Sequence, residues 1–293
     1  MSAHDSSRSG PGTVRVVTDS TAVLPAEMAA AAALRIVPLT VTISGEDGLE
    51  GIEVTPDDVA RALAERRHHV TTSRPAPAAF TAVYQELLDG GASGVVSVHL
   101  SAKLSGTYEA AVLAAEEFGG RVRVVDSMAA GSAVGFVARA AATAAADGAD
   151  VERAHEAALA AVGRVETLFY VDTLEYLRRG GRISAASALL GTALAVKPIL
   201  HVLRGEVVLK EKVRTAARGL ARLADLAVEA AGESDVDIAV QHLAAADRAQ
   251  ALCDQLVERF GDRVKDAFVA DVGAVIGAHT GPGVIGVTVH RRP

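Results

Sequence analysis

Hydroxyl and carboxylate side chains follow apolar stretches at several points in the first half of the chain. The segments concerned are Thr18-Asp19-Ser20-Thr21, Thr71-Thr72-Ser73, Ser101 with Ser105-Gly106-Thr107, and Asp126-Ser127. Such groups, together with the free backbone N–H groups that begin a helix, bind small anions. The same residue types are the usual helix N-caps, so at any one junction, as for Asp19 or Asp126, a cap or loop-fixing role is the more common explanation. The residues alone predict a site for a small anionic ligand of unspecified identity, in the crevice of an α/β sheet.

A glycine-rich stretch near the C-terminus, HTGPGVIG at 279–286, contains the spacing G-x-G-x-x-G. A dinucleotide-binding loop with this spacing opens a helix and is followed about 20 residues later by an acid. Only seven residues follow Gly286, and Pro282 removes a backbone N–H that a phosphate would need. We interpret the stretch as a tight turn between two C-terminal strands, with His279 at the strand-to-turn junction.

The motifs of common hydrolases, zinc proteases and nucleotide-binding loops are absent, and no spacing of histidines and acids predicts a metal site. Ser105, His279 and Asp126 can be combined on paper as a catalytic triad. Any chain of this size offers such combinations, so we keep a serine-dependent enzyme only as an alternative.

The elements that must position these groups alternate along the first half. Strands are predicted at 14–20, 35–43, 94–101 and 121–127, and helices at 24–34, 55–66, 75–91, 105–120 and 128–146. Thr55 and Asp58 form a predicted capping box, with Pro56 at the first helical position. Strands separated by helices indicate a parallel sheet covered on both faces.

The second half predicts a mixed sheet. A short strand begins near Thr167, and two helical pieces broken at Gly180 and Gly181 follow it. The segment 197–213 reads as two strands joined at residues 204–206, followed by helices at 214–231 and 245–260, strands at 235–243 and 264–272, and a final strand. The fold class is therefore α/β with two domains, at 13–163 and 164–293, after a disordered tail at 1–12.

Composition narrows the classes of function. The net charge is −7, which argues against nucleic acid as a partner. The longest uncharged run, residues 272–290, contains five glycines and a proline, so no integral membrane segment is expected. The single cysteine, Cys253, and the lack of an apolar leader at the N-terminus predict a cytoplasmic protein.

Seven short motifs follow one another along the chain: TDSTAVLP at 18–25, TSRPAP at 72–77, LSAKLSGTYEAA at 100–111, VVDS at 124–127, DTLEYLRRGGRIS at 172–184, KPIL at 197–200 and HTGPGVIG at 279–286. In this order they resemble the DegV family of bacterial fatty-acid-binding proteins, from about Val14 to the C-terminus. The resemblance implies an N-terminal three-layer domain with a parallel sheet, a C-terminal domain with a mixed sheet, and a fatty acid held between them.

The resemblance also implies roles for individual residues. Thr72 and Ser105 match the positions that hold the fatty-acid carboxylate in the family, and His279 lies close to the same group. Further residues that the resemblance or the junctions place at the head group or an interface are Asp19, Ser20, Ser73, Arg74, Gly106, Thr107, Asp126, Ser127 and Arg182. Arg74 stands where the family often has glutamine. The small-residue segments 128–138 and 184–196 are candidates to line the tail tunnel.

By this resemblance the protein is a carrier that has no catalytic activity of its own and uses no metal or cofactor. It would bind a long-chain fatty acid such as palmitate or oleate and present it to the catalytic subunit of a fatty acid kinase for acyl phosphate formation. The alternative is a serine-dependent acyl hydrolase or small-carboxylate enzyme with Ser105 as nucleophile and His279 as base. A soluble ligand sensor is a third possibility.

Overall fold

The computed structural model describes residues 12–65, 69–183 and 197–293. The helical piece predicted after Gly181 and the candidate tunnel segment 184–196 lie outside these residues. So does the predicted tail, except Gly12, whose N–H donates to the carbonyl oxygen of Gly91 at 3.1 Å.

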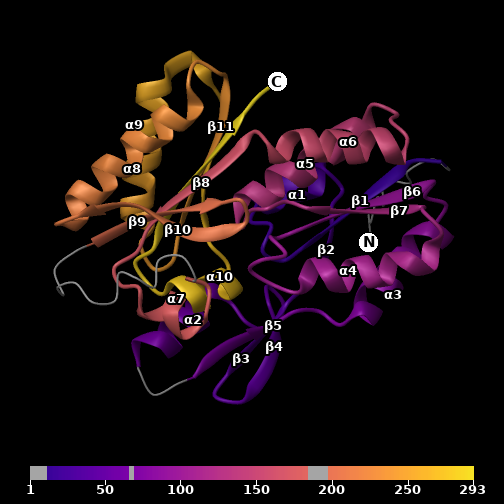
Figure 1. Ribbon diagram of the computed structural model, residues 1–293, viewed down its shortest axis with the longest axis horizontal. Coiled ribbons are helices and arrows are strands. Elements are labelled where there is room, and N and C mark those ends of the chain that lie inside the picture. Colours follow the sequence, from indigo (N-terminus) through magenta and orange to yellow (C-terminus); the bar gives the residue numbers. More distant parts are fainter. Residues whose placement is uncertain (1–11, 66–68, 184–196) are drawn as a thin grey trace, which may run out of the picture.

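A four-stranded parallel sheet forms the centre of the N-terminal part (Figure 1). Its strands, in spatial order, are β2 (Arg35–Val37), β1 (Val14–Asp19), β6 (Gly94–His99) and β7 (Val122–Asp126). Their apolar residues face helices on both sides, α5 (Ser132–Ala146) and α6 (Val151–Val162) on one, α3 (Pro77–Asp89) and α4 (Thr107–Ala115) on the other. The predicted parallel sheet with two covered faces is confirmed.

Three helical details differ from prediction. Helix α5 starts at Ser132 rather than 128, α1 is limited to Ala26–Ala31, and α4 ends in a 3-10 turn at Glu116–Phe118. Helix α6 was not predicted. Its buried face consists of alanines at 154, 158 and 161, which contrast weakly with the rest of an alanine-rich segment.

A separate antiparallel sheet was also missed. It consists of β4 (Glu46–Leu49), β3 (Thr40–Ile43) and β5 (Val70–Ser73), in that order. The single strand predicted at 35–43 is wrong, because the chain leaves the parallel sheet at Pro38, which has no N–H for the ladder, and enters this second sheet. The hydroxyls of 71–73 therefore belong to a strand of the small sheet and not to an edge of the parallel one.

Helix α2 (Pro56–Ala64) packs beside this small sheet and has the predicted capping box. The backbone N–H of Asp58 donates to Thr55 Oγ1 at 3.3 Å, and that of Thr55 donates to the Asp58 carboxylate at 3.0 Å.

The C-terminal part is built on a six-stranded mixed sheet. The strands, in spatial order, are β10 (Glu206–Val213), β9 (Lys197–Leu203), β8 (Val165–Tyr170), β13 (Ile285–Arg291), β11 (Val236–His242) and β12 (Val264–Asp271). Among the described strands of this sheet, only β11 and β12 pair in parallel, and the predicted hairpin of β9 and β10 is present. The helices are α7 (Glu175–Arg179), α8 (Ala216–Ala231), α9 (Ala246–Phe260) and α10 (Ala274–Thr280), with a 3-10 turn at Gly261–Arg263.

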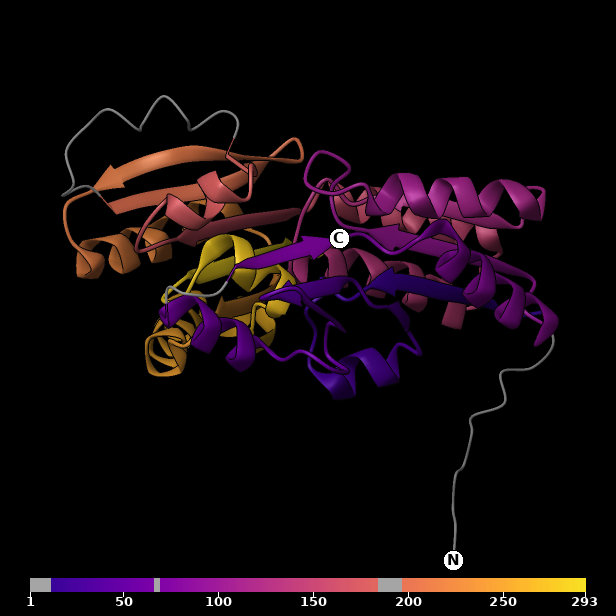
Figure 2. The ribbon, with the colours of Figure 1, turned by 90° about the horizontal axis from the view of Figure 1, so that it is seen from below.

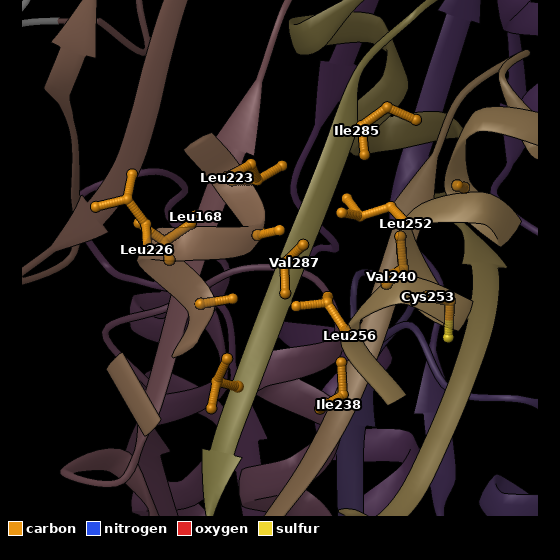
Figure 3. Packing of buried hydrophobic residues seen from close by; sticks show 14 of the residues in the cluster. Leu168, Leu223, Leu226, Ile238, Val240, Leu252, Cys253, Leu256, Ile285 and Val287 are labelled. Atoms are coloured by element: carbon orange, nitrogen blue, oxygen red, sulfur yellow. The ribbon is translucent and has the colours of Figure 1, made fainter. Parts of the chain in front are cut away.

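Alternation along β13 decides which residues can reach a ligand. Ile285, Val287 and Val289 point to α8 and α9 and join the main C-terminal core, as the packing in Figure 3 shows for the first two. Successive strand residues face opposite sides of a sheet, so Gly286 and Thr288 face away from that core. The second face thus points toward the N-terminal part of the chain.

The two parts lie side by side as two lobes (Figure 2). Arg139 of α5 joins them, because its guanidinium donates to Asp237 of β11 at 2.6 Å and to Asp266 of β12 at 2.9 Å. The parallel sheet and its helices end at Val162, and the mixed sheet begins at Val165. On this basis we propose a domain boundary between residues 163 and 164.

Candidate functional site

A largely apolar cavity of about 430 Å³ is lined by residues from both lobes. Leu39 and Leu100 of the N-terminal lobe face it, as do Phe169 and Val202 of the C-terminal lobe. A group of polar or small residues shares one region of its wall: Thr72, Ser73, Arg74, Ser105, Gly106, Arg182 and His279. An apolar cavity with a few convergent polar groups is the usual form of a small-molecule site.

Thr72 and His279 meet in this polar region, although 207 residues separate them in the chain. Thr72 Oγ1 and His279 Nε2 are 2.8 Å apart. His279 Nδ1 is buried without a partner among the described residues. Because a buried unpaired N–H is rarer than a buried unpaired acceptor, we assign the proton to Nε2. Nε2–H then donates to Thr72 Oγ1, and the Thr72 hydroxyl proton is free to donate to a ligand.

His279 lies in the last turn of α10, so its predicted place between two strands is wrong. The glycines that follow it connect a helix to β13, and Gly281 and Gly283 have φ angles of +78° and +86°. Burial, with a smaller contribution from the positive charge of Arg182, lowers the pKa of His279 to about 4. The imidazole is therefore neutral at pH 7.

Gly180 allows His279 to occupy this position. A Cβ atom at residue 180 would overlap His279 Nδ1, well inside contact distance. The backbone of Gly180 is in the ordinary right-handed region, with φ −74°, so only the close approach requires glycine here.

Gly180→Ala is expected to destabilise the protein by about 1–3 kcal/mol, because the imidazole must move. In a His279→Ala background the same change should cost close to nothing, and urea unfolding of the double-mutant cycle measures this coupling. Gly163→Ala is a matched control, since a Cβ there meets nothing closer than 3.8 Å. Equal costs in both backgrounds would contradict the proposed contact.

Two arginines border the polar region. Arg182 donates through Nε to the carbonyl oxygen of Leu104 at 3.1 Å and through Nη1 to that of Gly180. Arg74 donates through Nη1 to the carbonyl oxygen of Gly106 at 3.1 Å. Within the described residues neither arginine has a carboxylate at ion-pair distance, so both positive charges are available to an anion.

Ser105 precedes α4 and lines the cavity beside Gly106. Its Oγ lies 2.9 Å from Thr107 Oγ1, and Thr107 itself is fully buried. No hydrogen bond joins Ser105 to His279 among the described residues. The His279 ring is instead hydrogen-bonded to Thr72. The arrangement favours two separate hydroxyl groups facing one ligand over a nucleophile paired with its base.

The remaining predicted residues do not line this cavity. Ser20 donates to Glu50 at 2.5 Å, and Asp126 accepts from the backbone N–H of Met128 at 2.8 Å. Ser127 exchanges hydrogen bonds with the backbone of Ala129. These side chains hold their loops, which is the capping or loop-fixing role considered above.

Asp19 belongs to a buried network with the geometry of a catalytic triad. His99 Nδ1 lies 3.0 Å from Asp19 Oδ2, and His99 Nε2 lies 2.7 Å from Ser97 Oγ. Tyr84 donates to the same Ser97 oxygen at 2.8 Å, and burial raises its pKa. All four side chains are fully buried and none lines the cavity, so the network cannot meet a substrate. It satisfies polar groups inside the core.

Glu50 links the N-terminal lobe to the helix that carries His279. Its Oε1 accepts the backbone N–H of Val275, at the start of α10, at 2.8 Å, and its Oε2 accepts from Ser20. The side chain is buried, and this burial raises its pKa from 4.5 to about 7.

Glu50, His99 and Gln241 were not singled out from the sequence. The last two can be found as polar residues within otherwise apolar strands.

Stability is expected to fall as pH rises from about 4.5 to 7, because the folded protein holds the Glu50 proton over a range in which the unfolded chain has lost it. The full effect is on the order of 3 kcal/mol. Glu50→Gln should remove this pH dependence. In urea unfolding, the free energy of unfolding of the variant should therefore increase relative to that of the wild type as pH rises. Glu53→Gln, at an exposed residue, is the control. Parallel pH profiles of wild type and Glu50→Gln would refute the prediction.

The described residues contain no group of three or more histidine, cysteine, aspartate or glutamate side chains placed to hold a metal ion. Within the same residues, no helix combines the length and apolar character needed to cross a bilayer.

Comparison with known proteins places this geometry in a family. The sequence model of the family described as "Uncharacterised protein, DegV family" matches residues 13–292 of this chain. The chain belongs to the DegV family. A DegV domain-containing protein of Streptomyces coelicolor is 51% identical over 279 residues, which cover 95% of this chain and 99% of the relative.

Two solved DegV structures have the same two-domain α/β fold. One, from Thermus thermophilus, is described as binding fatty acid, and it matches with a TM-score of 0.90 and 34% identity over 96% of this chain and all of its own. The other, a fatty acid binding protein from Bacillus subtilis, matches with a TM-score of 0.86 and 32% identity over the same shares. The fold predicted from the motifs is confirmed.

Proposed function

We propose that this DegV protein binds a long-chain fatty acid, such as palmitate or oleate, in the cavity between its two domains. The Thr72 and Ser105 hydroxyls hold the carboxylate, His279 contributes to this head-group site by orienting Thr72, and the acyl chain extends along the apolar wall. The observation that carries the proposal is a single cavity wall that combines this polar group with an extended apolar surface. The descriptions of the Thermus and Bacillus relatives support the class of ligand.

The apolar wall accounts for affinity. Burial of each methylene is worth about 0.8 kcal/mol, so a long chain gains on the order of 10 kcal/mol before the entropic cost of binding. Ala130 and Gly131, from the small-residue segment at 128–138, line part of this wall. Small side chains leave room for the guest.

The polar group accounts for orientation. The Thr72 hydroxyl, supported by neutral His279, donates to the carboxylate, and the Ser105 hydroxyl offers a second donor. Arg74 and Arg182 add positive charge nearby. Because hydroxyl groups hold the carboxylate, it needs no buried ion pair with an arginine, which would lock the head group away from a partner. Such charges also suit the greater negative charge of an acyl phosphate.

We infer that the protein acts in the cytoplasm as a carrier for the catalytic subunit of a fatty acid kinase. The sequence has no phosphate-binding loop, so the nucleotide would belong to the partner. The hydrolase alternative is not favoured, because Ser105 and His279 form no hydrogen bond with each other in the described structure.

The test is mass spectrometry of the freshly purified protein, first native and then after denaturation and lipid extraction. A stoichiometric long-chain fatty acid, or its uptake by stripped protein, is expected. Protein that neither carries nor takes up such an acid would overturn the proposal. Adding a fatty acid kinase catalytic subunit and ATP then tests presentation, with acyl phosphate as the readout and Thr72→Val as the control.

A further inference from the structure

The cavity wall has a second polar patch, formed by strands of the mixed sheet. Gln241 of β11, Thr288 of β13 and Thr167 of β8 lie on three adjacent strands, on the face opposite the α8 and α9 core. All three are buried, and Gln241 and Thr167 line the cavity. None of them belongs to the group around Thr72 and His279.

Hydrogen bonds fix the orientation of the Gln241 amide. Its Oε1 accepts from the backbone N–H of Ser132 at 3.2 Å and from Thr288 Oγ1 at 3.3 Å. The Ser132 N–H can only donate, so the oxygen of the amide must face it, and the opposite assignment is excluded. The amide nitrogen, Nε2, therefore points the other way.

Nε2 has no hydrogen-bond acceptor among the described residues, although Gln241 is only 3% exposed. Nε2 keeps some accessible surface, and Gln241 lines the cavity, so the amide nitrogen faces the cavity space. Gly131 keeps this position open, because a Cβ there would lie 2.7 Å from Nε2. An apolar cavity thus contains an amide with two N–H donors that no acceptor among the described residues receives.

Thr167 completes the pattern of donors and acceptors. Thr288 has one hydroxyl proton, which goes to Gln241 Oε1. Its contact with Thr167 Oγ1, at 3.2 Å, therefore uses the Thr167 proton. The Thr167 oxygen is left as an acceptor. The patch offers a ligand both N–H donors and a hydroxyl oxygen, which a plain hydrocarbon chain cannot use.

We propose that the preferred ligand is a fatty acid whose acyl chain carries a hydroxyl group, accepted at this patch. The hydroxyl oxygen accepts from Gln241 Nε2, and its proton is free for Thr167 Oγ1. An unpaired amide facing a hydrocarbon chain is costly, so the protein distinguishes an oxygenated chain from a plain one. The inference rests on the proposed function and specifies the substrate class of the same site.

The experiment compares stearate with a series of monohydroxystearates, with the hydroxyl at successive positions along the chain. Displacement of a fluorescent fatty acid from delipidated protein gives the affinities. We expect wild-type protein to bind at least one hydroxystearate roughly 2- to 10-fold more tightly than stearate. In Gln241→Met, which keeps side-chain length and removes both polar atoms, that preference should disappear or reverse.

The outcomes separate the two proposals. If no acid in the series binds, the proposed function is wrong. If stearate binds and no hydroxyl position improves affinity in the wild type, the fatty-acid site stands and the inference is overturned, without reference to any variant. A preference that survives in Gln241→Met, with stearate affinity retained, also overturns it, because the hydroxyl would then be recognised elsewhere.

Discussion

Thr72→Val is expected to lower the affinity for a long-chain fatty acid roughly 10- to 150-fold, which is the usual value of a hydrogen bond to a charged group. Valine has nearly the shape of threonine but cannot donate to the carboxylate, and it leaves His279 Nε2–H without its acceptor. Displacement of a fluorescent fatty acid measures the change. Ser105→Ala should have an effect of similar size.

Thr71→Val is the matched control for this experiment. Thr71 is the preceding residue of β5, so its side chain points to the opposite face of the small sheet and does not line the cavity. It should bind as the wild type does. If Thr72→Val and Ser105→Ala both bind a fatty acid with wild-type affinity, the assignment of the head-group site is wrong.

Gly286→Leu is expected to weaken long-chain binding roughly 50-fold. Gly286 lies on the cavity face of β13, paired with Gln241 on one side and Phe169 on the other. A leucine side chain there would occupy the space of about three methylenes, each worth about 0.8 kcal/mol. Affinities across a series of saturated acids measure the effect, and acids about three carbons shorter should lose much less.

Gly286→Ala separates blocking from general damage at this position. An added Cβ would lie no closer than 3.6 Å to its neighbours, which is ordinary contact, so alanine should fold and bind nearly as glycine does. A leucine variant with the stability of the alanine variant and unchanged long-chain affinity would show that the acyl chain does not pass Gly286.

Local sequence patterns were enough to predict many of the elements. The capping box at Thr55 and Asp58, the hairpin of 197–213 and the parallel sheet of the first half depend on interactions between near neighbours or on apolar periodicity, and all are present. The order of seven motifs was sufficient to identify the family, which the match over residues 13–292 confirms.

Errors arose where long-range packing overrode the local pattern. The run 35–43 is apolar enough for one strand, yet Pro38 divides it between two sheets. His279 seemed to precede a turn between strands, but it lies at the end of α10. Glu50 holds the start of this helix from 225 residues away in the chain. Seven residues make a short helix that needs tertiary support, and its sequence predicts it only weakly.

The residue types of the candidate site were evident from the sequence, and their arrangement came only with the tertiary structure. Hydroxyls, arginines and a histidine in motifs indicated an anion site, but the pairing of Thr72 with His279 spans both lobes. The direction of the Gln241 amide is likewise set by Ser132, which lies 109 residues away and whose N–H must be satisfied. Such contacts depend on how separate elements pack, and each element's own sequence records only its local preferences.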